Sequence, residues 1–252
     1  MAVPRQLMPL RRINRRILLE MNLPTTFGKT DLVHFIANKR KLTNYLEICT
    51  SSTGARYWQI EGTRFNRARR LMYNCPMDFD DGFPIDYKIV GFDIANAIAE
   101  LKLSAERVDV CLVDGWHTYD CAIRDLTGAY EMLADGGVLV VHDCSPATER
   151  IASSNLVEGE WSGVSYRSYL NFVLARQDLY YCTVDVDYGC GIIFKSRTVE
   201  ITGLPACEPK VIAEWFGVQK DDQLAFKFFS ENRAKLLRLV SAKSFVHGLN
   251  RR

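Results

Sequence analysis

The sequence predicts an α/β fold with a doubly wound, mostly parallel sheet. Short apolar runs alternate along the chain with segments in which apolar residues recur at helical spacing. In the clearest example, apolar runs at 108–113 and 138–141 flank a helical pattern over 121–133. A strand, a crossover helix and a second strand explain this pattern, because parallel neighbours need such a connection.

A second observation places a ligand-binding turn near the start of the sheet. Residues 44–49 are an apolar run that leads into small residues at 50–54, and a helical pattern follows over 55–62. Strand, small-residue turn and helix form the first unit of nucleotide-binding α/β folds. Gly54 permits a positive φ angle or a close approach of the backbone to a ligand.

The remaining elements follow from the same patterns and from turn residues between them. After the last parallel strand, two β-rich runs predict an antiparallel hairpin that closes the sheet. In chain order, these elements are helices over 5–21 and 31–39, strands over 71–75 and 85–90, helices over 94–103 and 164–175, the hairpin strands 179–185 and 188–194, a weak strand or connector over 198–204, and a helical region over 210–246.

We therefore expect three parts in the chain. An N-terminal helical extension covers residues 1–42, the α/β domain covers 43–198, and a C-terminal helical extension covers 199–252. The last part is expected to pack on the domain or on an oligomer partner. These two extensions are the natural places for residues that determine ligand specificity or form a homo-oligomer contact.

Composition limits the class of protein. The chain has 252 residues, 48% of them hydrophobic, and a formal net charge of +2, which gives no broad footprint for nucleic acid or a membrane surface. No apolar run reaches the ~18 residues of a membrane span. The eight cysteines include no CxxC pair, and the basic N-terminus lacks a secretory signal pattern. We expect a reduced, cytoplasmic protein.

Polar side chains follow both strands of the central unit. Asp114 and His117 come after the first strand, and His142 and Asp143 come after the second. Ligands of open α/β sheets bind at such strand ends, and two close carboxylates repel unless a cation or proton lies between them. Asp114, His142 and Asp143 together suit Mg²⁺, Mn²⁺ or another divalent cation. Alternatively, Asp114 contacts a cofactor amino group and the second pair only caps a loop.

His117 is the candidate general base, with Asp114 and Asp143 as its catalytic partners. It lies three residues after Asp114, on the turn that enters the crossover helix. Imidazole is suited to taking a proton near pH 7. The alternative is a histidine that caps the helix or contacts a cofactor.

Several motifs resemble the class I S-adenosylmethionine-dependent methyltransferases, in the subgroup with an Asp-Gly-x-His fourth motif. The resemblance implies a Rossmann-like seven-stranded sheet with a terminal antiparallel β-hairpin, and S-adenosylmethionine as cofactor. In similar metal-dependent enzymes, acids at the places of Asp114 and Asp143 bind the metal. The motifs are residues 45–48 (YLEI) before a Gly-containing turn, 113–119 (VDGWHTY), 124–126 (RDL), 133–143 (LADGGVLVVHD) and 185–191 (DVDYGCG).

The resemblance also implies a set of cofactor contacts, with two departures from the usual pattern. Cys49 stands where a glycine is expected, and Asn74 lies near the place of the acid that usually ends the second strand. The full set is Glu47, Cys49, Thr50, Ser51, Gly54, Asn74, Asp93, Asp114, Trp116 and His117.

Three of these residues also have structural explanations. Glu47 suits the amino and hydroxyl groups of a ligand, but a carboxylate there also stabilises the following helix N-terminus. Asp93 precedes a helix, so it is equally an N-cap. Trp116 would stack on adenine or belong to the core.

The leading hypothesis is a metal-assisted O-methyltransferase that acts on a hydroxyl group of a small molecule, first a sugar or glycoside and alternatively a phenolic or polyketide acceptor. A non-catalytic, methyltransferase-like binding protein is a second class, which the altered first motif favours and the Asp114, His117 and Asp143 set disfavours. A nucleic-acid methyltransferase is a third class, and only the local clusters of arginine residues favour it. We therefore expect no nucleic-acid partner.

Overall fold

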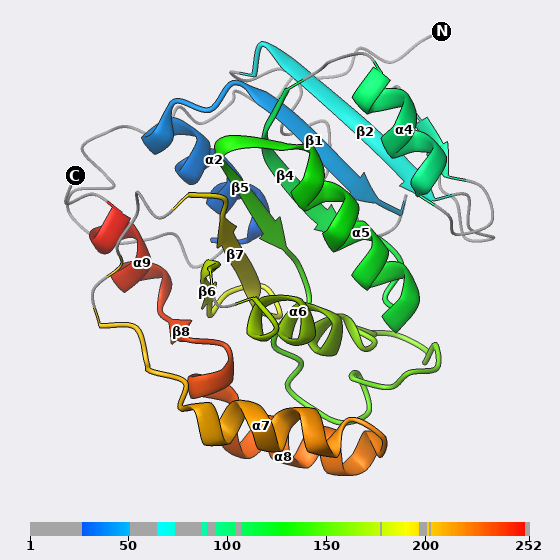
Figure 1. Ribbon diagram of the computed structural model, residues 1–252, viewed down its shortest axis with the longest axis vertical. Coiled ribbons are helices and arrows are strands. Elements are labelled where there is room, and N and C mark those ends of the chain that lie inside the picture. The colour runs from blue at the N-terminus through cyan, green and yellow to red at the C-terminus, as the bar shows by residue number, and fades with distance from the viewer. Residues whose placement is uncertain are drawn as a thin grey trace, which may run out of the picture.

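The computed structural model describes residues 27–50, 65–73, 87–89, 94–103, 107–176, 178–196, 201 and 203–249. Within these residues, one eight-stranded sheet runs through the molecule in the order β3-β2-β1-β4-β5-β7-β6-β8 (Figure 1). The strands are β1 Asn44–Cys49, β2 Arg67–Tyr73, β3 Tyr87–Ile89, β4 Val108–Asp114, β5 Leu133–Val141, β6 Tyr180–Val184, β7 Cys190–Phe194 and β8 Leu239–Val240.

The pairing of the strands confirms the predicted fold class. Strands β3, β2, β1, β4 and β5 are parallel to one another, and β7 is antiparallel to both β5 and β6. This is a Rossmann-like sheet of seven strands that ends in a reversed hairpin. The two-residue β8 is an addition to the prediction, and it pairs in parallel with β6 at the end of the sheet.

The C-terminal region differs in detail from the sequence prediction. Residues 201, 203 and 204 form no strand, so the described part of 198–204 is a connector. The edge strand comes instead from Leu239–Val240, inside a region that the sequence predicts as helical. These two residues lie in the short connection between the helix that ends at Leu236 and the helix that begins at Ala242, and their pairing with β6 covers part of an open sheet edge.

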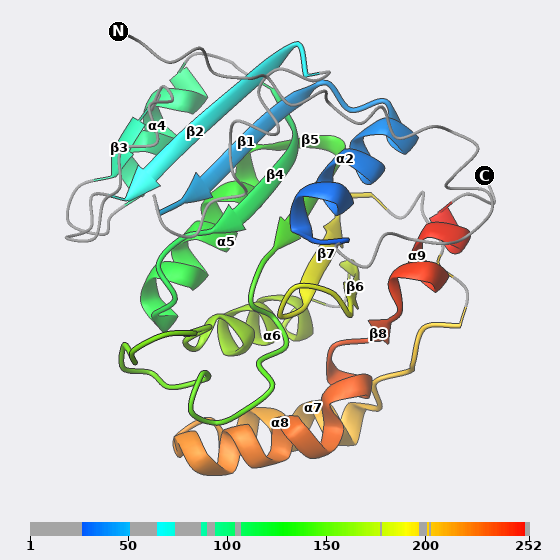
Figure 2. The ribbon, with the colours of Figure 1, turned by 180° about the vertical axis from the view of Figure 1, so that it is seen from behind.

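Helices cover both faces of the sheet. Figure 1 shows α4, α5 and α6 in front of it, and Figure 2 shows α2 and α9 on the opposite face. None of the helices in the described ranges has the length and apolar character of a membrane span. The predicted helices at 5–21 and 55–62 lie outside the described residues. The observed helices are α2 Lys29–Arg40, α4 Ala95–Leu103, α5 Tyr119–Met132, α6 Ser165–Leu174, α7 Pro209–Val218, α8 Asp222–Leu236 and α9 Ala242–Leu249.

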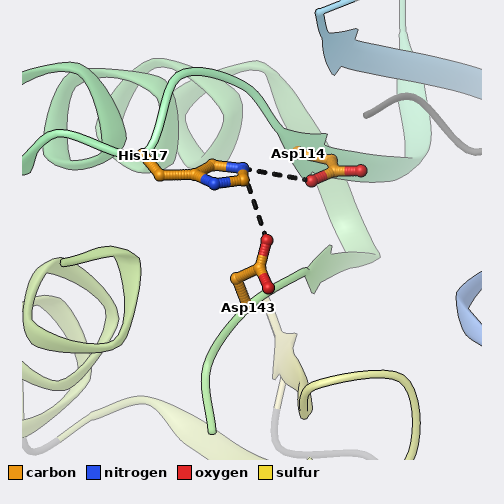
Figure 3. Close-up of side chains that lie close together, drawn as sticks. All are labelled: Asp114, His117 and Asp143. Atoms are coloured by element: carbon orange, nitrogen blue, oxygen red, sulfur yellow. Dashed lines mark ion pairs between the residues drawn. The ribbon is translucent and has the colours of Figure 1, made fainter. Parts of the chain in front are cut away.

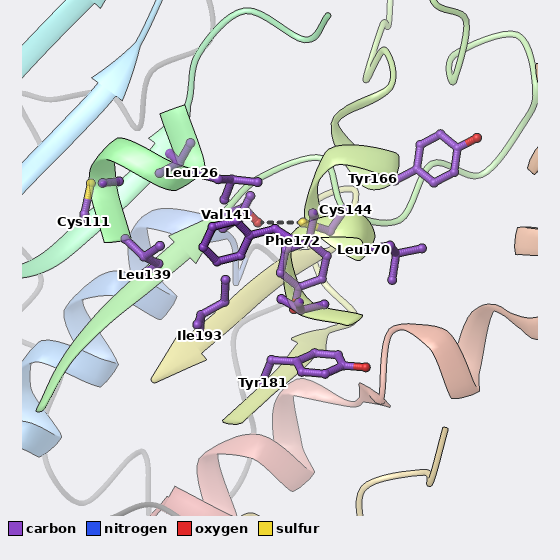
Figure 4. Close-up of a cluster of buried hydrophobic side chains, with 14 of the residues drawn as sticks. Cys111, Leu126, Leu139, Val141, Cys144, Tyr166, Leu170, Phe172, Tyr181 and Ile193 are labelled. Carbon is purple, nitrogen blue, oxygen red and sulfur yellow. Dashed lines mark hydrogen bonds between the residues drawn. The ribbon is translucent and has the colours of Figure 1, made fainter. Parts of the chain in front are cut away.

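Strand β4 is buried at every position because both of its faces are covered. Val110 and Leu112 belong to the core under α2 and α9, whereas Cys111 and Val113 belong to the core under α4, α5 and α6. Figure 4 shows part of the second core, with Cys111 among its side chains. Alternation along the strand leaves Asp114 as the polar end of the row that faces α2.

Gly115 follows the last residue of β4 at a point where a buried acid, Asp125, leaves no room for a side chain. A Cβ atom at this position would lie 2.2 Å from Oδ2 of Asp125 and 2.9 Å from Cε2 of Tyr73. The Tyr73 hydroxyl donates a hydrogen bond to Asp125, which ties the end of β2 to α5. Burial raises the pKa of Asp125 to about 8, so this carboxyl group is protonated at neutral pH.

The raised pKa of Asp125 gives the fold a pH dependence. The unfolded chain holds this proton with a pKa of about 4, so the stabilisation is full below about pH 4 and is lost as the pH rises through about 8. Asp125→Asn keeps an oxygen for the Tyr73 hydroxyl and does not ionise. Thermal unfolding from about pH 5 to about pH 9 should show a smaller loss of stability in the variant, by several degrees in Tm. Identical pH profiles would contradict this explanation.

Candidate active site

Four predicted side chains meet at the C-terminal edge of the sheet. Asp114 ends β4, His117 lies in the turn before α5, and His142 and Asp143 follow β5, with all four side chains buried. Figure 3 shows Asp114, His117 and Asp143 pointing toward one another. They meet because β4 and β5 are neighbouring parallel strands whose ends lie side by side.

The backbone after β5 is held in a sharp turn that directs Asp143 inward. Asp143 has a φ angle of 58°, in the left-handed region that aspartate tolerates better than most residues. On either side of it, the amide of His142 donates to Val113 O at 3.0 Å and the amide of Cys144 donates to Gly189 O at 2.9 Å. The surrounding strands therefore fix this strained conformation.

The two imidazoles lie between the two carboxylates. Nδ1 of His142 is 3.1 Å from Oδ1 of Asp114 and 3.0 Å from Oδ2 of Asp143. Nε2 of His117 is 3.3 Å from Oδ2 of Asp143 and 3.6 Å from Oδ1 of Asp114. Acidic and basic groups thus alternate around a small buried centre.

The pKa values of these groups follow from that alternation. Burial works against the charged form of each, but attraction to Asp114 and Asp143 outweighs it and raises the pKa of His142 well above its ordinary value. The pKa of His117 is raised for the same reasons, with a hydrogen bond to Asp114 as the largest favourable contribution. Burial also opposes the charged form of the two carboxylates. Attraction first to the Lys29 ammonium and then to His142 nevertheless holds the pKa of Asp114 well below its ordinary value, and attraction to His142 lowers the pKa of Asp143.

His117 is oriented by the loop before α6. Its Nδ1 lies 2.9 Å from the carbonyl oxygen of Trp161, and the two rings are 5.4 Å apart. The amide of Val164 donates to the carbonyl oxygen of His117 at 2.9 Å. Because a carbonyl only accepts, Nδ1 carries a proton. The raised pKa favours a second proton on Nε2, directed at the two carboxylates, and loss of that proton leaves the Nε2 lone pair facing the centre of the cluster.

Three further side chains complete the cluster. Nζ of Lys29 lies 2.5 Å from Oδ2 of Asp114. Asp187 accepts a hydrogen bond from the Lys29 amide at 3.1 Å, and its other oxygen lies 3.4 Å from Nε2 of His142. Ser162 donates its hydroxyl hydrogen to Oδ1 of Asp143 at 2.7 Å.

Sequence reasoning missed Lys29 and Ser162 as site residues. No motif marks Lys29, which lies 85 residues from Asp114 along the chain. Asp187 carried a signal, since it belongs to the predicted hairpin motif 185–191, but nothing in that motif indicates the contact with His142.

The predicted cofactor contacts are only partly within the described residues. Glu47, Cys49 and Thr50 are buried at the end of β1. Glu47 accepts a hydrogen bond from the Tyr45 hydroxyl at 2.8 Å, and Cys49 accepts one from Nε of Arg70 at 3.4 Å. Their binding of a cofactor stays a prediction. Four further predicted contacts, Ser51, Gly54, Asn74 and Asp93, lie outside the described residues.

Trp116 directly precedes His117 in the chain, and its ring contacts the ring of Trp161 edge to face, with 5.3 Å between the ring centres. The ring is half-buried, so it belongs neither wholly to the core nor wholly to solvent. A stacking role against adenine stays a prediction.

The donor set of the cluster fits a divalent cation. Asp114, His117 and Asp143 each offer a ligand atom, and these atoms lie within 4.8 Å of one another. His142, which belongs to the set predicted from the sequence, places Nδ1 next to the same carboxylates. Two carboxylates and an imidazole are suitable ligands for Mg²⁺ or Mn²⁺.

Part of the chain that contains the clustered side chains is similar to a known protein family. Residues 31–144 match the model of a family described as a methyltransferase domain. This stretch of the chain is similar to a methyltransferase domain. The matched range ends one residue after Asp143, so it contains β1, β4, β5 and all four clustered side chains.

Solved structures similar to this chain include several O-methyltransferases. An O-methyltransferase from Bacillus cereus in complex with SAH is 13% identical, with 71% of this chain and 86% of that chain covered and a TM-score of 0.45. The O-methyltransferase TomG from Streptomyces achromogenes, in complex with SAM, is 16% identical over 70% of this chain and 84% of that chain, with a TM-score of 0.47. MycE methyltransferase from the mycinamycin biosynthetic pathway, in complex with Mg and SAH, is 14% identical over 72% of this chain and 53% of that chain, with a TM-score of 0.41. Among curated proteins, none matches the chain.

Gly163 offers a test of how tightly His117 is held. A Cβ atom at Gly163 would lie 2.2 Å from the carbonyl oxygen of His117, whereas one at Gly159 would have nothing within 4 Å. Both glycines have positive φ angles, so alanine at either position carries backbone strain of the same kind. Gly163→Ala should therefore lower the free energy of unfolding by about 2 kcal/mol more than Gly159→Ala. Chemical denaturation measures this difference, and equal losses would contradict the close contact.

Proposed function

We propose that the protein is an S-adenosylmethionine-dependent O-methyltransferase that acts on a hydroxyl group of a small molecule. The observation that carries the proposal is the buried cluster of Asp114, His117, His142 and Asp143 at the C-terminal edge of the sheet, within the residues that are similar to a methyltransferase domain. Such an edge is where α/β folds bind their ligands, and this one brings an imidazole to two carboxylates.

His117 is the proposed general base. S-adenosylmethionine supplies the methyl group, and the acceptor oxygen takes it by in-line displacement while the carbon–sulfur bond breaks. The hydroxyl proton leaves to Nε2 of His117, so the products are a methyl ether, the neutral sulfide and a protonated imidazole. The carbonyl of Trp161 holds Nδ1 and so keeps Nε2 directed at the reaction centre.

Asp114, His142 and Asp143 are the proposed ligands of a divalent cation. His142 is suited to this role because Asp187 lies 3.4 Å from its Nε2 and leaves Nδ1 facing the two carboxylates. A carboxylate behind a ligating imidazole is a common way to orient it. A cation held there would lower the pKa of the acceptor hydroxyl, while the protein residues orient the acceptor and exclude water.

Aromatic side chains around the cluster support a ring-shaped acceptor. Trp116 and Trp161 lie on the His117 side, and Tyr188 meets the His142 ring edge to face at 6.3 Å. Tyr188 is 39% exposed, so its ring is accessible to a ligand. Aromatic faces pack against the apolar faces of sugar rings and against planar phenols. A sugar or glycoside is the first acceptor to test, and a phenolic or polyketide compound is the alternative.

His117→Ala tests the proposed base. Turnover of hydroxylated acceptors should fall about 10²- to 10⁴-fold, whereas calorimetric binding of S-adenosylmethionine should persist. His247→Ala, on the exposed side of α9, is the matched control and should keep wild-type turnover. Normal turnover in His117→Ala would exclude the base role. A wild-type protein that binds no S-adenosylmethionine, with or without Mg²⁺, would overturn the proposed function.

A further inference from the structure

Lys29 places a second kind of cation in the proposed metal site. Its ammonium group lies 2.5 Å from Oδ2 of Asp114, and the two side chains are only 15% and 0% exposed. An ion pair on the surface contributes little to the stability of a protein because water and salt screen its charges. The pair of Lys29 and Asp114 is shielded from water. The Lys29 ammonium should therefore affect the binding of any other cation to Asp114.

The start of α2 fixes the Lys29 side chain in this position. Lys29 is the first residue of the helix, and its backbone amide donates to Oδ2 of Asp187 at 3.1 Å. The positive end of the helix thus lies against one acid while the side chain contacts another. Lys29 is anchored at both its amide and its ammonium group.

The two oxygens of Asp114 have different neighbours. Oδ2 faces the ammonium of Lys29, whereas Oδ1 faces the imidazoles of His117 and His142. A divalent cation among the carboxylates and imidazoles would use Oδ1, and the ammonium would then lie across the same carboxylate. Two cations that share one buried carboxylate repel each other strongly, because the surroundings have a low dielectric constant.

We propose that Lys29 is a built-in cation that competes with divalent metal ions for Asp114 and so sets the metal affinity of the site. This inference rests on the proposed metal site of the O-methyltransferase, and it assigns to Lys29 a role that is separate from the chemistry of methyl transfer. Lys29 neutralises Asp114 when no metal is bound, and it keeps divalent binding weak and reversible.

Removing the charge of Lys29 should strengthen divalent binding. Lys29→Met keeps a long unbranched side chain but leaves the acids without their fixed counter-charge, so the dissociation constant for Mn²⁺ should fall at least about tenfold. Lys29→Arg keeps the charge and should bind Mn²⁺ about as weakly as the wild type. Lys29→Gln is a second neutral variant, and it should behave like Lys29→Met.

Lys39→Met is the matched control. It makes the same substitution in the last turn of the same helix, about 15 Å along the helix axis from Lys29. Its Mn²⁺ affinity should match the wild type. Asp114→Asn should abolish the gain when combined with Lys29→Met, because it removes the carboxylate for which the two cations compete.

The test is a Mn²⁺ titration of the full-length chain, followed by the electron paramagnetic resonance signal of free Mn²⁺ at constant pH and ionic strength. Circular dichroism and thermal unfolding establish that each variant is folded. The inference is overturned if neither neutral variant binds Mn²⁺ more tightly than the wild type, or if Lys39→Met produces the same gain. A separate titration of the wild type with S-adenosylmethionine distinguishes the two proposals. A wild type that does not bind S-adenosylmethionine would overturn the proposed function. A wild type that binds it, together with neutral Lys29 variants of unchanged Mn²⁺ affinity, would overturn only the role of Lys29.

Discussion

Two buried carboxylates at the ends of neighbouring parallel strands are the constraint on which this structure depends. Asp114 follows β4 and Asp143 follows β5, and the pairing of Val113 with Val141 prevents the two strand ends from moving apart. Like charges held this close are unfavourable unless cations or protons lie between them. The raised pKa values of His117 and His142 are the response of the fold to that constraint.

Much of the surrounding backbone serves to hold these groups. The strained conformation of Asp143 is fixed by hydrogen bonds from its neighbours to β4 and to the turn after β6. Trp161 orients His117, and Asp187 links His142 to the start of α2. Segments far apart in the sequence thus meet at one point, which gives the site a fixed geometry before any ligand binds.

The sequence predicted the sheet well because the determining signals are local. Apolar runs such as 108–113 mark buried strands, and helical spacing such as that over 121–133 marks crossover helices. The candidate site followed from one further rule, that polar residues after parallel strands gather at one edge. This rule is sufficient for His142 and Asp143 because their strand positions are fixed by the runs that precede them.

Sequence patterns did not predict the features that depend on contacts between distant parts of the chain. Lys29 reaches Asp114 only because α2 packs across the sheet, and no local pattern encodes that packing. Strand β8 forms because two residues lie beside the open edge of β6, although their surroundings are helical in pattern. The carboxyl group of Asp125 is protonated because of burial, which a sequence motif alone does not reveal.

The proposed metal site is tested by anomalous X-ray diffraction from crystals grown with Mn²⁺ and S-adenosylhomocysteine. One strong manganese peak is expected within coordination distance of Asp114, His142 and Asp143, on the side of Asp114 that faces away from Lys29. A saturating Mn²⁺ concentration that gives no peak at these residues, or a peak only at other acids, would contradict the proposed site.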